Sequence, residues 1–120
     1  KLSAFCGAVS AGYACGAAIT YMLGGNFNQI ANTIINTLAN TSGIICDGAK
    51  PSCAAKISSA LDAALLAHTM SMHDDVFHAD EGIVKDDLEK TIRAVGYIGR
   101  EGMKSTDIEV LNIMIDKVCP

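Results

Sequence analysis

The feature that most constrains this chain is the stretch from Leu2 to Leu23, which contains no charged side chain. A helix of this length could cross a bilayer. However, its glycines, alanines and serines leave few large apolar groups for contact with lipid. Ala8, Gly12 and Gly16 form a ridge of small residues, which lets helices approach closely in soluble bundles as well. We therefore expect a long Gly/Ala-rich helix buried among other helices, and no membrane span.

Four further segments repeat apolar residues at helical spacing, and no stretch alternates at period two. Gly24-Gly25-Asn26 should end the first helix, and Pro51 suits the first turn of the third. Asp86 and Asp87 suit the first turn of the fourth. The predicted helices cover approximately residues 2–23, 26–42, 51–72, 86–98 and 106–118. We expect an all-α fold in which residues 1–120 form a single compact domain of about five helices.

Helical periodicity also predicts which side chains are buried. The expected buried positions are Phe27, Ile30, Ile34, Ile35 and Leu38 in the second segment, Leu61, Leu65 and Leu66 with the alanines around them in the third, Leu88, Ile92, Val95 and Ile98 in the fourth, and Ile108, Leu111, Ile115 and Val118 in the fifth. Gly99 and Gly102 should close the fourth helix, and Thr106 with Glu109 forms a capping-box pattern at the start of the fifth. The polar stretch 73–82 should be a loop.

Charge and cysteine content exclude some classes of protein. The formal net charge is −4, with no cluster of Lys and Arg that could neutralise phosphates, so no nucleic-acid partner is expected. Five cysteines are an odd number without the spacing of a disulfide scaffold, and no secretory signal is recognisable. We expect a reduced, cytoplasmic protein. Because the chain starts abruptly with Lys1 in a helix-like pattern, we also expect it to be the C-terminal part of a longer protein.

Chemistry is concentrated in the stretch from Gly43 to Cys53, which we call the cysteine loop. It carries Cys46, Asp47, Gly48 and Lys50 and ends at the start of a helix. Its two cysteines are separated by six residues, which is wider than the usual spacing of a structural zinc knuckle. Cys53 falls in the first helical turn, where N–H groups and the helix dipole favour an anionic centre such as an iron–sulfur cluster. Gly48 should adopt an unusual backbone angle.

A cluster site needs a third cysteine, from Cys6, Cys15 or Cys119. Cys6 and Cys15 are nine positions apart, which places them on opposite faces of a helix, so both cannot face the cysteine loop. On spacing alone, buried thiols or a structural zinc explain the pattern about as well as a cluster does. A three-ligand cluster would leave one iron open to substrate.

The segment Ser42 to Ala54 resembles the signature of L-cysteine desulfidases, which are related to iron–sulfur L-serine dehydratase alpha chains. The glycine-rich helix that contains Cys6 and the turn from Glu81 to Asp87 are similar as well, so the resemblance covers essentially the whole chain. It implies that Cys6, Cys46 and Cys53 hold a [4Fe-4S] cluster. Cys15 and Cys119 would be bystanders.

The same resemblance implies an α,β-elimination without pyridoxal phosphate. An open iron would bind the leaving group while a base removes the α-proton of a small amino-acid substrate. L-Cysteine would give pyruvate, ammonia and sulfide, and L-serine would give pyruvate and ammonia. Family members are several times longer, and their N-terminal part supplies the base. We therefore expect the catalytic base outside this chain, the chain alone to be inactive, and its partners to be that N-terminal part and, as an option, a second copy.

Several polar residues have both a functional and an ordinary interpretation. Asp47 and Lys50 are candidates for substrate binding, although loop carboxylates and lysines are more often turn formers and solvated charges. The three histidines and their neighbouring aspartates do not share one helix face and are not expected to bind metal: His68, His73, His78, Asp74, Asp75 and Asp80. The alternative of another class is a non-catalytic helical structural or interaction module with zinc or no metal.

Overall fold

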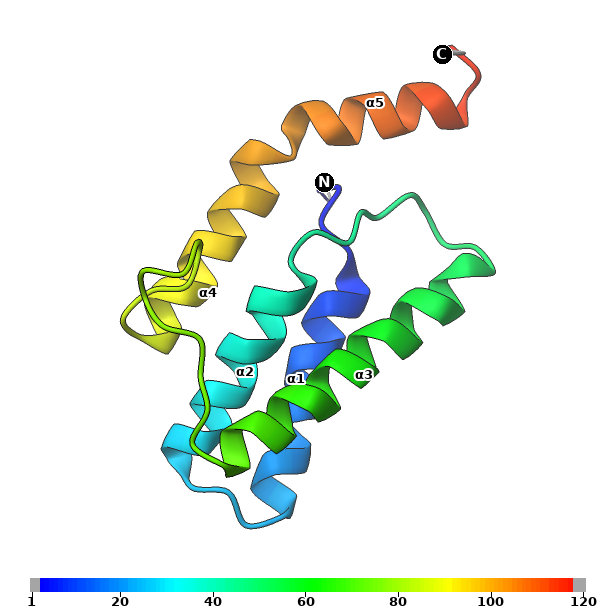
Figure 1. Ribbon diagram of the computed structural model, residues 1–120. Helices are drawn as coiled ribbons and strands as arrows, with labels where there is room; N and C mark the ends of the chain where they lie inside the picture. The colour runs from blue at the N-terminus through cyan, green and yellow to red at the C-terminus, as the bar shows by residue number, and fades with distance from the viewer. Residues whose placement is uncertain (1–2, 118–120) are drawn as a thin grey trace.

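A computed structural model describes residues 3–117 as five α-helices, with no strand in that range (Figure 1). The helices are α1 (Gly7–Met22), α2 (Phe27–Thr41), α3 (Ser52–Met72), α4 (Leu88–Tyr97) and α5 (Lys104–Met114), and a π-helical turn over Ile98–Gly102 joins the last two. The predicted all-α class is therefore confirmed. Helices α1, α2 and α3 pack against one another, while α4 and α5 form an arm that runs from α2 past the amino end of α1 (Figure 1).

Local signals set the end of α1, as expected, and the start of α2. Gly24 has a φ of +85°, a conformation that glycine adopts without strain. Asn26 caps α2: its side chain accepts a hydrogen bond from the Gln29 N–H, and the Gln29 side chain accepts one from the Asn26 N–H, both at 3.0 Å. The turn between α1 and α2 is therefore fixed by sequence-local chemistry.

Small residues allow α1 to pack closely on α2 and α3. A Cβ added at Gly12 would lie 2.9 Å from the Cβ and carbonyl oxygen of Ala60, and one added at Gly16 would lie 3.0 Å from Thr33. Helix α1 buries only the face that carries Val9, Gly12, Gly16 and Thr20. The expectation of burial on all sides was wrong, because α2 and α3 both lie on that one face and leave the other face open.

Helix α3 buries the alanines of its expected buried side but not the leucines. Leu61, Leu65 and Leu66 are exposed, whereas its buried side consists of Ala60, Ala63, Ala64, Ala67 and Ser71. Close approach to α1 and α2 leaves room only for alanine-sized groups in the contact. The stripe of large residues was therefore the wrong guide to the core here.

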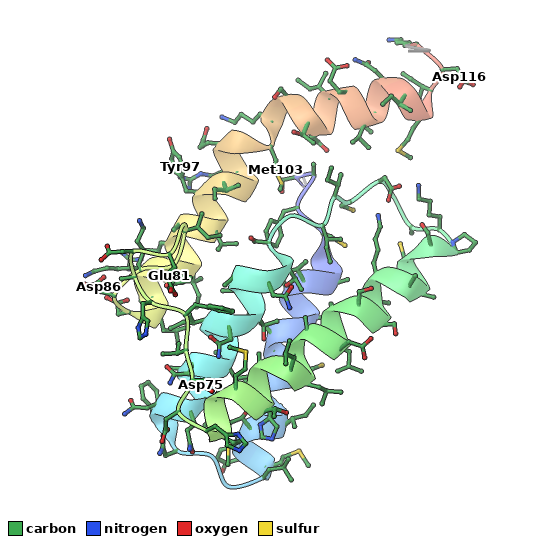
Figure 2. The ribbon with its side chains drawn as sticks, in the orientation of Figure 1. Asp75, Glu81, Asp86, Tyr97, Met103 and Asp116 are labelled. Carbon is green, nitrogen blue, oxygen red and sulfur yellow. The ribbon has the colours of Figure 1, made fainter. Side chains whose placement is uncertain are left out.

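A buried amide holds the loop after α3. Asn36, which is 2% exposed, donates to the Asp75 carbonyl oxygen at 3.0 Å and accepts from the Phe77 N–H at 3.1 Å. Figure 2 shows Asp75 where this loop passes α2. The predicted polar loop is thus tied to the core by one side chain.

The arm formed by α4 and α5 differs from the expectation in three ways. The chain stays helical through Gly99 and Gly102, because Gly99 packs against the Phe5 side chain rather than ending the helix. Helix α5 begins at Lys104 after Met103, at the bend seen in Figure 2, so the predicted capping box at Thr106 is wrong. The apolar stripe of α5 is exposed: no residue of the helix is buried, and Val118 lies outside the described residues.

The predicted stripes of α2 and α4 are buried in part. Leu38, Ile35 and Val95 lie in the core, but Phe27 is 78% exposed at the start of α2. No helix within residues 3–117 is long and apolar enough to span a membrane.

Candidate functional site

A backbone pairing brings the segments of Cys6 and Cys46 together. Phe5 and Ile45 form an isolated antiparallel bridge, in which the Cys6 N–H donates to Ile44 O at 3.2 Å and the Cys46 N–H donates to Ala4 O at 2.7 Å. The sequence predicted Cys6 inside a helix. It instead precedes α1 in extended conformation, since the chain pairs with the cysteine loop before the helix begins.

Burial distinguishes the cysteines. Cys6 is 6% exposed and belongs to a core cluster with Val9, Leu38 and Val95, and the half-buried Cys46 packs against the same cluster. Cys15 is exposed on the open face of α1. The helical argument that set it opposite Cys6 does not apply, because Cys6 precedes the helix. Cys119 lies outside the described residues.

Cys53 occupies the first turn of α3, as predicted. Its Sγ lies 3.4 Å from the carbonyl oxygen of Gly48, whose φ of +90° confirms the expected unusual backbone angle. The N–H groups of Cys53 and Ala54 donate to Lys50 O and Pro51 O, at 2.9 and 3.1 Å. We expected free N–H groups around the Cys53 thiol, but these two N–H groups already have hydrogen-bond partners.

Asp47 is the centre of the polar contacts in the cysteine loop. It forms ion pairs with both Lys50 and Lys56, and its side chain is 32% exposed. The hydrogen bond from Lys50, followed by that from Lys56, lowers the pKa of Asp47 to about 2. The two substrate-binding candidates Asp47 and Lys50 are therefore in contact with each other.

Lys56 is the residue that the sequence did not identify as part of the site. Its Nζ donates to Ile45 O at 2.7 Å and contacts Asp47, so it reaches from α3 to both neighbours of Cys46. The hydrogen bond to Asp47 is the main cause that raises the pKa of Lys56, and charges on Cys6 and Cys53 act in the same direction. Its position three residues after Cys53, and so on the same side of α3, was the available signal.

A groove of about 490 Å³ adjoins these residues. One wall is the cysteine loop with Asp47, Lys50 and Lys56, and the other is α5 with Val110, Ile113 and Met114. The groove therefore combines two ammonium groups with one carboxylate beside apolar side chains.

The candidate cysteines do not form a site for a single metal ion. Within residues 3–117, no group of three or more His, Cys, Asp or Glu side chains could hold a metal ion. The structure also keeps the histidines apart. His68 Nδ1 lies 2.9 Å from Thr20 Oγ1, His73 Nδ1 lies 2.8 Å from Thr69 O, and the His78 N–H donates to Glu81 at 2.6 Å.

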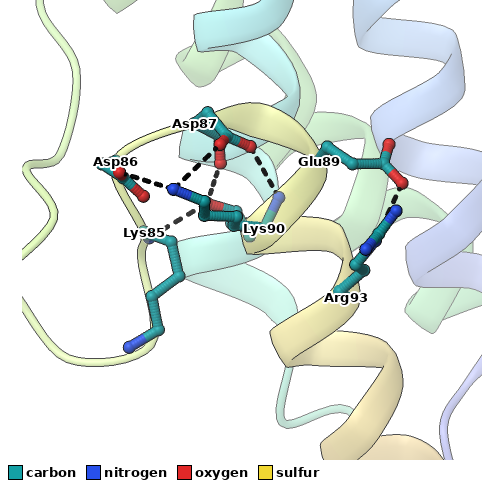
Figure 3. Close-up of polar contacts among 7 residues, drawn as sticks. Lys85, Asp86, Asp87, Glu89, Lys90 and Arg93 are labelled. Atoms are coloured by element: carbon teal, nitrogen blue, oxygen red, sulfur yellow. Dashed lines mark hydrogen bonds and ion pairs between the residues drawn. The ribbon is translucent and has the colours of Figure 1, made fainter.

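The acidic segment before α4 serves as a helix start. Asp87 caps α4 by accepting a hydrogen bond from the Lys90 N–H at 2.7 Å, and the Lys90 ammonium pairs with Asp86 at 2.7 Å (Figure 3). Glu89 pairs with Arg93 one turn further on, at 3.1 Å. These charges satisfy one another at the surface, in agreement with the predicted solvated turn and helix start.

Comparison with known proteins identifies relatives over nearly the whole chain. The family described as serine dehydratase alpha chain matches residues 1–112. A UPF0597 protein of Treponema denticola is 57% identical over 115 residues, which cover 96% of this chain and 27% of the relative. A UPF0597 protein of Finegoldia magna is 54% identical over 117 residues, which cover 98% of this chain and 28% of the relative. The chain thus spans just over a quarter of these relatives. No solved structure matches.

Proposed function

Because this chain belongs to the serine dehydratase alpha-chain family, we propose that it is the cluster-binding part of an iron–sulfur lyase for a small amino acid. L-Cysteine desulfidase is the activity that the resemblance of the cysteine loop favours. L-Serine dehydratase is the second candidate, and the description of the matching family favours it. The two share an α,β-elimination and differ in the leaving group, which is sulfide or water.

The observation that carries this proposal is the pairing of Cys6 with Cys46 next to the helix start that bears Cys53. Three thiols at one end of the helical bundle are the donor set that iron–sulfur clusters use. Within the described residues, no group of three or more His, Cys, Asp or Glu side chains is placed to hold one metal ion. Thiolates are the ligands that iron–sulfur clusters use, so the three cysteines suit a cluster by their chemistry.

In this proposal, Cys6, Cys46 and Cys53 hold a [4Fe-4S] cluster. When bound, the cluster supplies an iron with an open position that acts as a Lewis acid on the leaving group. Lys50, whose side chain is 41% exposed, can attract the substrate carboxylate in the groove beside α5. Asp47 holds Lys50 and Lys56 in place, and it can accept a hydrogen bond from the substrate ammonium if either lysine moves.

The catalytic base is not assigned to a residue of this chain. The relatives are almost four times as long as the matched segment, and we propose that the base lies in the part of such a protein that precedes it. No pyridoxal phosphate takes part in this proposal. We also propose a cytoplasmic location, because a cluster with thiolate ligands needs a reducing compartment.

Anaerobic reconstitution of the chain with iron and sulfide tests the cluster. We expect about four iron and four sulfide per chain. Cys6→Ser, Cys46→Ser and Cys53→Ser should each lose most of the iron, and Cys15→Ser, which alters an exposed thiol, should retain it. A colourless chain that binds stoichiometric zinc, or iron retention in Cys46→Ser, would reject the proposal.

The substrate is decided with a full-length relative. Pyruvate and sulfide formation by the Treponema denticola protein should be measured with L-cysteine and L-serine in parallel. Sulfide release with higher kcat/KM for L-cysteine supports a desulfidase, and preferential pyruvate formation from L-serine supports a dehydratase. Lack of elimination with either amino acid would reject both.

A further inference from the structure

One ammonium group connects the two segments that carry Cys46 and Cys53. Lys56 lies on α3 one turn after Cys53, and its Nζ donates to Ile45 O and pairs with Asp47. Since Ile45 and Asp47 are the two chain neighbours of Cys46, Lys56 holds this cysteine from both sides.

The remaining connection is made by the backbone. The bridge between Phe5 and Ile45 joins the Cys6 segment to the cysteine loop. The other hydrogen bonds between the loop and the start of α3 are local, between residues 48 and 54. The contact from Lys56 to Ile45 spans eleven residues and closes the loop at its far end.

We propose that Lys56 is a positioning residue: it locks the cysteine loop onto α3 and so fixes Cys46 and Cys6 relative to Cys53. This role rests on the proposed cluster-binding function. Lysine suits it because one ammonium donates up to three hydrogen bonds and its long stem can pack along α3.

The neighbouring Lys50 offers a matched comparison. It also pairs with Asp47, but its side chain is 41% exposed, against 22% for Lys56, and Lys56 has the additional hydrogen bond to Ile45 O. An exposed ion pair alone stabilises a fold little. The positioning effect should therefore belong to Lys56, and Lys50→Met serves as the control.

The first experiment uses the metal-free, reduced chain and needs no cluster. We expect Lys56→Met to raise amide hydrogen exchange at Cys46 and Cys6, whose N–H groups form the bridge, about tenfold. Alkylation of Cys46 by iodoacetamide, followed by mass spectrometry, should accelerate by a similar factor. Lys50→Met should change both rates less than about twofold.

Lys56→Gln keeps a donor for Ile45 O and should give intermediate rates, and it replaces Lys56→Met if that variant does not fold. Thermal unfolding followed by circular dichroism checks that the helices persist. Rates in Lys56→Met or Lys56→Gln that equal those of the unmodified chain would overturn the positioning role.

The second experiment uses the reconstituted chain. Lys56→Met should lose its iron–sulfur absorbance to a chelator about tenfold faster than the unmodified chain, while Lys50→Met should lose it at the original rate. Equal loss rates in all three chains would overturn the role of Lys56 at the cluster. If the unmodified chain takes up no cluster, the proposed function fails, and the exchange and alkylation rates still decide whether Lys56 fixes the loop.

Discussion

The two parts of the molecule obtain their helices in different ways. Helices α1, α2 and α3 bury one another through glycine, alanine and threonine contacts, whereas α5 buries none of its residues. Helix α5 nevertheless carries large apolar side chains, among them Ile108, Leu111 and Ile113, which are exposed. The sequence can therefore specify a helix with an apolar stripe even though no other described element covers that stripe. Conversely, helices can pack closely through contacts between small side chains.

The largest expected difference concerns leucine truncation. Leu38→Ala in α2 removes a side chain that is 2% exposed, so we expect a loss of about 2–5 kcal/mol in the free energy of unfolding. Leu111→Ala in α5, where the leucine is 47% exposed, should cost less than about 1 kcal/mol. Urea unfolding of both variants measures this. Equal losses would mean that α5 is buried against another surface in solution.

The effect of a glycine-to-alanine substitution on the free energy of unfolding should have opposite signs in the two parts. Gly12→Ala places a Cβ 2.9 Å from Ala60, and we expect it to lower the free energy of unfolding by about 1–3 kcal/mol. Gly96→Ala in α4 meets no atom within 4 Å and should raise it by about 0.5–1 kcal/mol. Thermal and urea unfolding of the pair provide the test. A stabilising Gly12→Ala would contradict the close contact of α1 with α3.

Removal of the buried Asn36 amide should loosen the loop that connects α3 to α4. Asn36→Ala leaves the Phe77 N–H and the Asp75 carbonyl without their side-chain partner, at a cost of about 1–3 kcal/mol. Asn40→Ala, which alters an exposed residue of the same helix, should change stability by less than about 0.5 kcal/mol. Hydrogen exchange should increase at Phe77 in Asn36→Ala alone. Unchanged exchange there would show that other contacts hold the loop.

The smallest expected effect lies where the cysteine loop faces α5. The folded pKa of Asp47 is about 2, below its ordinary value of about 3.9. Its ion pairs therefore stabilise the fold above about pH 4, and this stabilisation is lost as the pH falls toward 2. Carboxyl titration by NMR should therefore give a midpoint near 2. Lys56→Met should raise that midpoint, as should Lys50→Met. A midpoint near the ordinary value in the unmodified chain would contradict the ion pairs.

Sequence reasoning succeeded where the cause was local. Gly24 and the start of α3 before Cys53 follow from backbone preferences that need no distant partner. It failed for Leu61 and for the capping box at Thr106, because burial depends on which helix arrives opposite and a cap depends on where the preceding helix ends.

The candidate site divides in the same way. Cys46, Cys53 and the turn at Gly48 could be read from one loop, and the resemblance selected Cys6 as their partner. Only the tertiary structure pairs Cys6 with Cys46 through the Phe5–Ile45 bridge and turns Lys56 toward both neighbours of Cys46.

By itself, the sequence determined the all-α class, the uncharged close-packing helix and the position of the cysteine loop, since periodicity, side-chain size and backbone preference act over a few residues. The tertiary structure decided that α1 is open on one face, that alanines rather than leucines line the contact of α3, and that Lys56 belongs to the site. Those outcomes depend on contacts between segments far apart in the chain, and spacing along one segment carries no information about the direction from which another approaches.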